Sequence, residues 1–504
     1  MSETTETTTK PQGQSASNDV FMTVPADPRI KMPESASAHL AWHSGDETID
    51  YVATASHLEV RGDTGALIGQ MFALSYVRVD ADGRLDANRP VTFCYNGGPG
   101  CASVPINFGG IGPRRVKTDG VSHLAYPIEV EDNPQTLLRQ SDLVFLDALG
   151  TGYSTVAEGA DTSKIFGVDG DADCFARAIT SWLEENGRWI SPLYLFGESY
   201  GTVRNAVLMR LLGERSVKLC GVVMLSAIFD WVQTIEGEDL YHLGMTPTMA
   251  ATAQFFGKAG QGIDPDDWFD QATDFTEDVL APALLRGDRL APEREQQVAS
   301  QLSRLIGLPE GLVRSRRLRI TLEDFRRNLL ADEGRAVGRL DTRFSSDAPV
   351  AVQQSSDWFA GEDAADDAVD ASWVNAFRAF LHDELGYRAP ARYLSSNYEG
   401  VGTKWKWEHQ QPGFSWPTGS PNVAYDVAVA MRRNPRMKVC ILGGRYDAAT
   451  TWWNVAHDMS CQFLSPALKE RLEWHRYGCG HMAYVDEETL ERMGADLAAF
   501  YDKA

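Results

Sequence analysis

The chain has 504 residues, too many for one compact core, and its 43% hydrophobic and 23% charged residues are typical of a folded protein. Its 47 Lys and Arg against 70 Asp and Glu give a formal net charge of −23, which argues against nucleic-acid binding because phosphate backbones are also negative. No apolar run is long enough for a membrane span. Seven scattered cysteines without a CxxC pair favour reduced thiols in a cytoplasm over disulfides or a zinc site.

The N-terminal stretch MSETTETTTKPQGQSASND is rich in Thr, Ser and Gln, with no early positive charge and no apolar core. A secretory signal needs both, so none is expected, and residues 1–25 are predicted to be a disordered tail. The segments HLEVRGD and QMFALSYVRVDADGR follow. They are expected to form an antiparallel meander at the start of the core.

Six short apolar runs then end in glycine or polar turns, at residues 89–100, 141–152, 192–201, 217–228, 437–447 and 471–481. Such nearly continuous runs suit strands that are buried on both faces of a parallel sheet. Helical patterns separate several of them, at residues 171–187, 203–214 and 424–434. Strands that alternate with helices predict an α/β protein with a doubly wound, mostly parallel sheet.

One long segment interrupts this alternation. From about 232 to 415 there is no convincing buried strand, and amphipathic, charge-rich pieces predict helices. An acidic run, GEDAADDAVD at 361–370, is expected to be a solvated surface loop. We therefore predict a core of residues 26–231 and 416–504 with a largely helical cap, residues 232–415, inserted between them. The aromatic piece at 404–416 either lines the cleft or packs where cap and core meet, and packing is favoured.

The motif Gly197-Glu198-Ser199-Tyr200-Gly201 fits G-x-S-x-G, which is weak alone because chance produces it in many chains. Here the strand-like PLYLF precedes it and the helix-like TVRNAVLMRLL follows. That context is typical of the nucleophile elbow of α/β hydrolases, where small residues flank a serine in a tight turn. Ser199 is therefore the predicted nucleophile, and a base must remove its proton.

Chain order in this fold is Ser, then Asp or Glu, then His. Of the six histidines after Ser199, His481 lies in a Gly-rich loop, GCGH, just past the last predicted strand. Asp447 stands at the tip of the penultimate strand, MKVCILGGRYD. Because an open α/β sheet builds its site beyond the carboxyl ends of its strands, His481 is the predicted general base and Asp447 the acid that orients it. A loop-capping role is the alternative for Asp447.

The oxyanion of an acyl-transfer reaction needs two N–H donors. One should be the amide of Tyr200, directly after the nucleophile, and the other should come from a Gly-rich turn after an earlier strand. Asn96-Gly97-Gly98-Pro99-Gly100 is that turn. A tight turn with no ligand is the alternative reading.

Four motifs in this order resemble the serine carboxypeptidase family: NGGPGCAS (96–103), GESYG (197–201), LGGRYDAAT (442–450) and GCGHMAY (478–484). The expected lack of a signal peptide, and turns such as RPVTFCYNGGPG and GPRRV, resemble the bacterial branch of this family. The resemblance covers roughly residues 50–231 and 415–490. It implies the same triad, with the Gly98 and Tyr200 amides as oxyanion donors. It further implies that a substrate's free C-terminal carboxylate is bound by Asn96, Gly97 and Glu198. A carboxyl must be protonated to donate to a carboxylate, which favours activity at acidic pH.

The chain departs from the family pattern at three places. Cys94 stands where members often carry Trp, and Gly110 stands where a second Glu often pairs with the Glu before the nucleophile. Half of the carboxylate-binding apparatus is therefore expected to be missing. Cys101 matches a family disulfide cysteine, but no Cys occurs between 221 and 439, so no bridge is expected.

These features predict a serine carboxypeptidase-like hydrolase that removes C-terminal residues from peptides through an acyl-enzyme. An acyltransferase or esterase that uses the same acyl-enzyme is the alternative, motivated by Gly110 and Cys94. A non-catalytic binding protein that kept the fold is a third possibility. No metal constellation or phosphate loop stands out, so no cofactor or metal is expected. The expected partner is a peptide or small acyl substrate, and neither nucleic acid nor membrane.

Overall fold

The computed structural model describes residues 29–118, 120–121, 124, 126–347 and 363–502. The tail predicted to be disordered, residues 1–25, lies outside these ranges. Across the described ranges, no helix is both long and apolar enough to cross a membrane.

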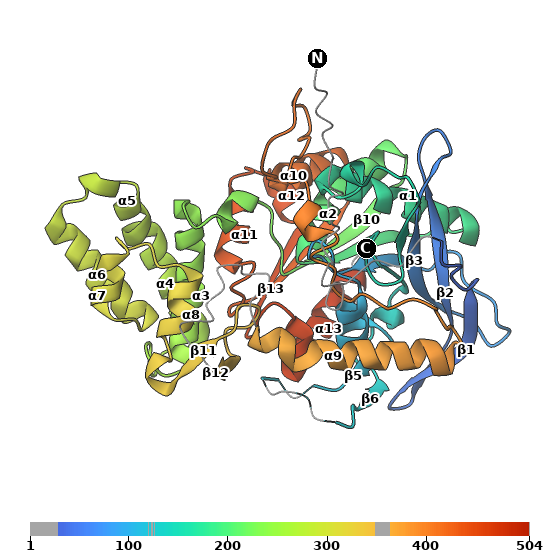
Figure 1. Ribbon diagram of the computed structural model, residues 1–504, viewed down its shortest axis with the longest axis horizontal. Coiled ribbons are helices and arrows are strands. Elements are labelled where there is room, and N and C mark those ends of the chain that lie inside the picture. The colour runs from blue at the N-terminus through green and yellow to red at the C-terminus, as the bar shows by residue number, and fades with distance from the viewer. Residues whose placement is uncertain (1–28, 119, 122–123, 125, 348–362, 503–504) are drawn as a thin grey trace, which may run out of the picture.

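A mixed sheet of ten strands forms the centre of the molecule (Figure 1). Its first three strands are the predicted antiparallel meander: β1 (Ala36–Ser44), β2 (Glu47–Arg61) and β3 (Leu67–Arg78). The short β8 (Thr155–Val156) also pairs with β3. Beyond β3, parallel neighbours follow in the order β7 (Asp142–Leu146), β4 (Val91–Tyr95), β9 (Leu193–Glu198), β10 (Leu219–Leu225), β13 (Lys438–Gly444) and β14 (Leu472–Tyr477).

Helices cover both faces of this sheet. One face carries α1 (Val168–Asn186), α2 (Tyr200–Glu214) and α10 (Ala424–Arg433). The other carries α9 (Ala364–Ala379) and α13 (Glu487–Asp502). Successive strand residues supply opposite faces, since Phe93 belongs to the first cluster and Cys94 to the second. The doubly wound, mostly parallel α/β class is therefore confirmed.

Between β10 and β13 the chain leaves the sheet and builds a helical insertion, at the left of Figure 1. Its helices are α3 (Asp239–Phe255), α4 (Pro265–Phe275), α5 (Ala281–Leu284), α6 (Pro292–Ile306), α7 (Glu310–Ser315) and α8 (Leu322–Asn328). They share a hydrophobic cluster that includes the buried Val298 and Phe325 and reaches Trp453 of the core. A small hairpin follows, formed by β11 (Arg335–Val337) and β12 (Ser345–Asp347). Two short helices, α11 (Trp452–Ser460) and α12 (Pro466–Lys469), connect β13 to β14.

The acidic run at 361–370 was predicted to be a surface loop, and for its described residues this is wrong. Asp363 caps α9, because its side chain accepts from the amides of Ala365 and Asp366. Small apolar residues of the run, including Ala368 and Val369, are buried in the hydrophobic cluster on this side of the sheet. The aspartates suit the positive N-terminal end of a helix, which explains why so acidic a segment is helical.

Candidate active site

Ser199 occupies a sharp turn between β9 and α2. Its φ of 59° lies in the left-handed region, and its amide donates to the Leu225 carbonyl at 3.0 Å. A Cβ at Gly197 would lie 2.3 Å from the carbonyl oxygen of Gly201, so the turn requires glycine there. The predicted strand–turn–helix is therefore present, and it holds the serine at the carboxyl end of a central parallel strand.

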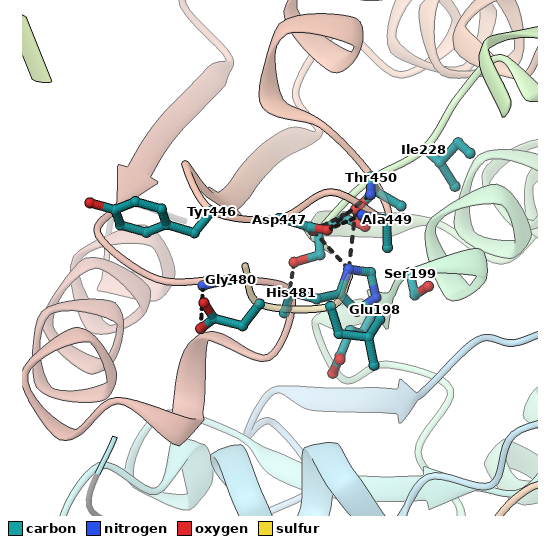
Figure 2. Close-up of polar contacts among 12 residues, drawn as sticks. Glu198, Ser199, Ile228, Tyr446, Asp447, Ala449, Thr450, Gly480 and His481 are labelled. Carbon is teal, nitrogen blue, oxygen red and sulfur yellow. Dashed lines mark hydrogen bonds and ion pairs between the residues drawn. The ribbon is translucent and has the colours of Figure 1, made fainter. Parts of the chain in front are cut away.

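Two loops from neighbouring strands bring a histidine and an aspartate together beside it. Asp447 follows β13 and His481 follows β14, and His481 Nδ1 lies 2.7 Å from Asp447 Oδ2. Figure 2 shows the imidazole between this carboxylate and Ser199. In the described part of the chain no hydrogen bond joins the Ser199 and His481 side chains. Catalytic contacts of this kind are often loose before substrate binds.

The loop after β13 surrounds Asp447 with donors. Its Oδ1 accepts from the amides of Ala449 and Thr450 at 2.8 and 2.9 Å, and the Thr450 hydroxyl lies 2.7 Å from Oδ2. Ser226, after β10, donates from its hydroxyl to the His481 carbonyl at 2.6 Å. Thr450 and Ser226 were not among the site residues predicted from the sequence. A hydroxyl residue three positions after an aspartate at a strand tip was the available signal for Thr450.

The charge of His481 depends on both carboxyl groups near it. Burial lowers its pKa, but the hydrogen-bonded Asp447 and the nearby Glu198 outweigh this, and the pKa is raised above the ordinary value. Arg339 acts in the opposite direction. Since Asp447 engages Nδ1, the ring's other nitrogen remains to exchange a proton with Ser199.

The predicted oxyanion turn packs directly against the elbow. A Cβ at Gly97 would lie 2.3 Å from the amide nitrogen of Tyr200, so the two segments approach as closely as glycine allows. Gly98 has a φ of 105°, which also favours glycine. Neither the Gly98 nor the Tyr200 amide donates a hydrogen bond to any residue that the structure describes. Two unused donors therefore lie beside the candidate nucleophile.

The residues expected to bind a carboxylate, which we call the carboxylate set (Asn96, Gly97 and Glu198), line one cavity with Ser199 and His481. The volume of this cavity is about 240 Å³. The Ile106 amide donates a hydrogen bond of 3.0 Å to Asn96 Oδ1, and this bond orients the Asn96 side chain. Glu198 is buried, and this burial raises its pKa to about 7.

The insertion closes the site from the other side. Arg339, after β11, lines the 240 Å³ cavity together with Asp363, Asp366 and Asp370 from the start of α9. Arg339 also lines a second cavity of about 280 Å³, bounded by the loop after Asp447 and by α3, α8 and α11. The site thus has two compartments that meet at Arg339. This arginine was not among the predicted site residues, because it lies in a hairpin without a recognisable motif.

Two departures from the family pattern lie outside both cavities. Cys94 is buried within the sheet, and Gly110 lies in η1 (Pro105–Ile111), against the ring of Tyr484. The first two tryptophans of the aromatic piece at 404–416 pack, as favoured: Trp405 stands edge-on to Tyr200 with ring centroids 5.1 Å apart, and Trp407 stacks on a core tryptophan. This aromatic packing supports the elbow through Tyr200, the residue directly after Ser199. Phe414 and Trp416 of the same piece are exposed.

The fold, with a serine elbow after one parallel strand and an aspartate and a histidine after two others, is that of an α/β hydrolase. A family model described as serine carboxypeptidase matches residues 70–225. The predicted resemblance to serine carboxypeptidases is therefore confirmed, and the model match lies within the first of its two segments, residues 50–231. The matched segment contains Ser199 and the carboxylate set, and it ends before Asp447 and His481.

Individual relatives agree with this match over short stretches. Serine carboxypeptidase-like 36 of Arabidopsis thaliana is 32% identical over 119 residues, which cover 22% of this chain and 22% of that protein. Pheromone-processing carboxypeptidase KEX1 of Saccharomyces cerevisiae (strain ATCC 204508 / S288c) is 34% identical over 97 residues, 19% of this chain and 12% of that protein. The matches thus span about a fifth or less of these relatives.

The structural similarity to known proteins covers more of the chain than the sequence matches do. The crystal structure of KEX1(delta)p, a prohormone-processing carboxypeptidase from Saccharomyces cerevisiae, superposes with a TM-score of 0.52. This superposition covers 94% of each chain at 15% sequence identity. It shows that the two chains share a fold.

Proposed function

We propose that this protein is a serine carboxypeptidase-like hydrolase in which Ser199 is the nucleophile, His481 the general base and Asp447 its orienting acid. One observation supports this function above all others. Ser199 and His481 line one cavity, and all three members of the carboxylate set line it too. In this arrangement His481 Nδ1 lies 2.7 Å from Asp447 Oδ2. The match to serine carboxypeptidases over residues 70–225 agrees with it.

The reaction proceeds through an acyl-enzyme. His481 takes the proton of Ser199 as its Oγ attacks the scissile carbonyl, and the oxyanion accepts from the Gly98 and Tyr200 amides. The tetrahedral intermediate collapses, the C–N bond breaks, and His481 gives the proton to the leaving amine. Water then adds to the ester, with His481 as base, and releases the acid and the free serine.

The two compartments divide the substrate between them. The cavity with the carboxylate set receives the leaving C-terminal residue, and the second cavity receives the acyl side of the bond. A protonated Glu198 donates to the substrate carboxylate, whereas an ionised one repels it. Since its pKa is raised to about 7, this contact persists into weakly acidic and nearly neutral solution.

The test compares three substrates with one acyl group: an N-blocked dipeptide, its C-terminal amide and a simple ester, from about pH 4 to 8. We expect the free acid to be cleaved faster than the amide, with a bell-shaped pH profile. The rising limb reports His481 becoming neutral, and the falling limb reports Glu198 becoming ionised. The ester should show the rising limb alone. Equal rates on acid and amide, with ester hydrolysis intact, would remove the carboxypeptidase assignment.

An acyltransferase or esterase is the second candidate. It is favoured by the absence of a second carboxyl hydrogen-bonded to Glu198 among the described residues, where Tyr484 lies instead. Such an enzyme would pass the acyl group from Ser199 to an alcohol or amine in preference to water. Product analysis with added nucleophiles separates the two, because a dedicated transferase gives mainly the transfer product.

A further inference from the structure

Tyr484 fills the space beside Glu198. It lies in η11 (Ala483–Val485), is fully buried, and packs edge-on against Trp373 of α9. A Cβ on Gly109 would lie 2.8 Å from its ring, and one on Gly110 would lie 3.1 Å away. No longer side chain can therefore reach Glu198 from this part of η1 unless the tyrosine moves.

The hydroxyl of this tyrosine contacts Glu198 directly. Tyr484 Oη lies 2.9 Å from one carboxyl oxygen of Glu198 and 3.1 Å from the other. Burial and the adjacent Glu198 raise the pKa of Tyr484 well above its ordinary value. The phenol therefore keeps its proton over the working range and acts as a donor to Glu198.

Other titratable groups also face this pair. His481 and Asp447 face Glu198 from the loops after β14 and β13, and Asp366 faces Tyr484 from α9. Asn96 touches both members as a polar, non-titrating neighbour. Burial and Asp447 favour the protonated form of Glu198, whereas His481, Tyr484 and Asn96 favour the carboxylate. Of these, Tyr484 can be altered without touching the triad or the carboxylate set.

We propose that Tyr484 is a positioning residue whose hydroxyl, donated to Glu198, orients this carboxyl in the cavity and sets the pH above which it stops binding a substrate carboxylate. This inference rests on the proposed function of Glu198. Donation from a phenol stabilises an ionised carboxylate more than a protonated carboxyl. Without it Glu198 keeps its proton to higher pH, and the preference for a free C-terminal acid persists to higher pH.

Tyr484→Phe tests this because it keeps the ring between the η1 glycines and Trp373 and removes only the donor. We expect the falling limb of kcat/KM for the free-acid peptide to move up by about one pH unit, so that the acid-to-amide ratio above the limb rises roughly tenfold. The plateau rate of ester hydrolysis, above the limb that reports His481, should be unchanged. Tyr477→Phe is the matched control, since it removes a buried hydroxyl that donates to Asp496 at 2.8 Å. It should leave the limb in place. An unmoved limb in a folded Tyr484→Phe protein would overturn the inference.

A second replacement keeps the test decisive if Tyr484→Phe does not fold. Site-specific 3-fluorotyrosine at position 484 retains the hydroxyl and makes it a stronger donor. The falling limb should then move to lower pH, opposite to the shift expected for phenylalanine. A merely structural role for the ring predicts no shift, and that result would overturn the inference.

Infrared difference spectra without substrate separate this inference from the proposed function. The carboxyl band that Glu198→Gln removes should titrate at higher pH in Tyr484→Phe than in the unaltered protein. If that band moves but no peptide is cleaved, the carboxypeptidase function fails and the control of Glu198 by Tyr484 stands. If the free-acid peptide is preferred but neither the band nor the limb moves, Tyr484 has no such role.

Discussion

The sheet core and the helical insertion contribute in different ways to one site. The core supplies every group assigned to bond making and breaking, each at the carboxyl end of a parallel strand and each fixed by hydrogen bonds to other core residues. The insertion supplies Arg339 and walls of both compartments. Chemistry should therefore depend on the core, and the choice of substrate on the insertion.

A single short segment of the insertion connects it to the triad. The carbonyl of Arg339 accepts from the Ala448 amide at 3.1 Å, beside Asp447, and the carbonyl of Leu340 accepts from the His481 amide at 2.6 Å. The segment thus lies between the two loops that carry the acid and the base. The insertion can therefore tune the triad through this one segment without supplying any member of the triad.

The largest expected effect concerns the core. Ser199→Ala should lower kcat for the ester on the order of 10⁴-fold or more, because removing the nucleophile removes the acyl-enzyme route. It should also abolish labelling by a fluorophosphonate probe. Ser300→Ala in α6 is the matched serine control from the insertion and should keep full activity. Undiminished hydrolysis by Ser199→Ala would show that another residue is the nucleophile.

The next effect separates stability from chemistry. Phe325 is fully buried in the cluster of the insertion, and Phe325→Ala should lower the free energy of unfolding by ~3–5 kcal/mol. The folded protein should still hydrolyse the ester at nearly the normal rate. Phe93→Ala makes an equally buried change in β4, three residues before Asn96, and should lower both stability and activity. Urea unfolding followed by circular dichroism, with ester kinetics, measures both quantities. Equal losses of activity in the two variants would contradict the division between core and insertion.

A third prediction concerns the junction where the insertion leaves the core. Asp458 of α11 is buried, accepts from Gln233, and has a second carboxyl oxygen with no hydrogen-bond partner in the described structure. The pKa of Asp458 is raised to about 8, mainly by burial and secondly by the charge of the nearby Asp230. Between about pH 4 and 8 the unfolded chain has released this proton while the folded protein retains it, so stability falls as pH rises through that window.

Asp458→Asn removes this dependence, since asparagine resembles the protonated acid. Its free energy of unfolding should exceed that of the unaltered protein by about 2–4 kcal/mol at pH 8 and by little at pH 4. Asp274→Asn, an exposed change in α4, should give no pH-dependent difference. Urea unfolding at several pH values measures the effect. A constant difference between variant and parent across the range would contradict a raised pKa at Asp458.

These cases also explain what the sequence could predict. Ser199, Asp447 and His481 were predictable because each lies at the end of an apolar run, so one local pattern fixes both the strand and the residue that follows it. Their meeting follows from the parallel order of β9, β13 and β14. The structure brings these residues together as the motifs implied.

Other site residues depend on packing between distant segments. Tyr484 meets Glu198 across 286 positions of the chain, and no local pattern encodes such a contact. Arg339 reaches the site because its hairpin enters between two core loops. The acidic run differs, since its buried Ala364, Ala365, Ala368 and Val369 have helical spacing. That signal was present but was outweighed by the charge of the aspartates between them.

The smallest expected effect tests the contact between insertion and triad. Arg339 lowers the pKa of His481 by charge repulsion, so Arg339→Gln should raise it. Because a histidine base works in its neutral form, the rising limb of ester hydrolysis should move to higher pH by a few tenths of a unit if His481 is the base. Arg335→Gln, an exposed change in the same hairpin, is the matched control and should not move the limb. A limb that stays in place in Arg339→Gln would mean that the insertion shapes the compartments without tuning the base, and the two regions would be more independent than their shared contacts imply.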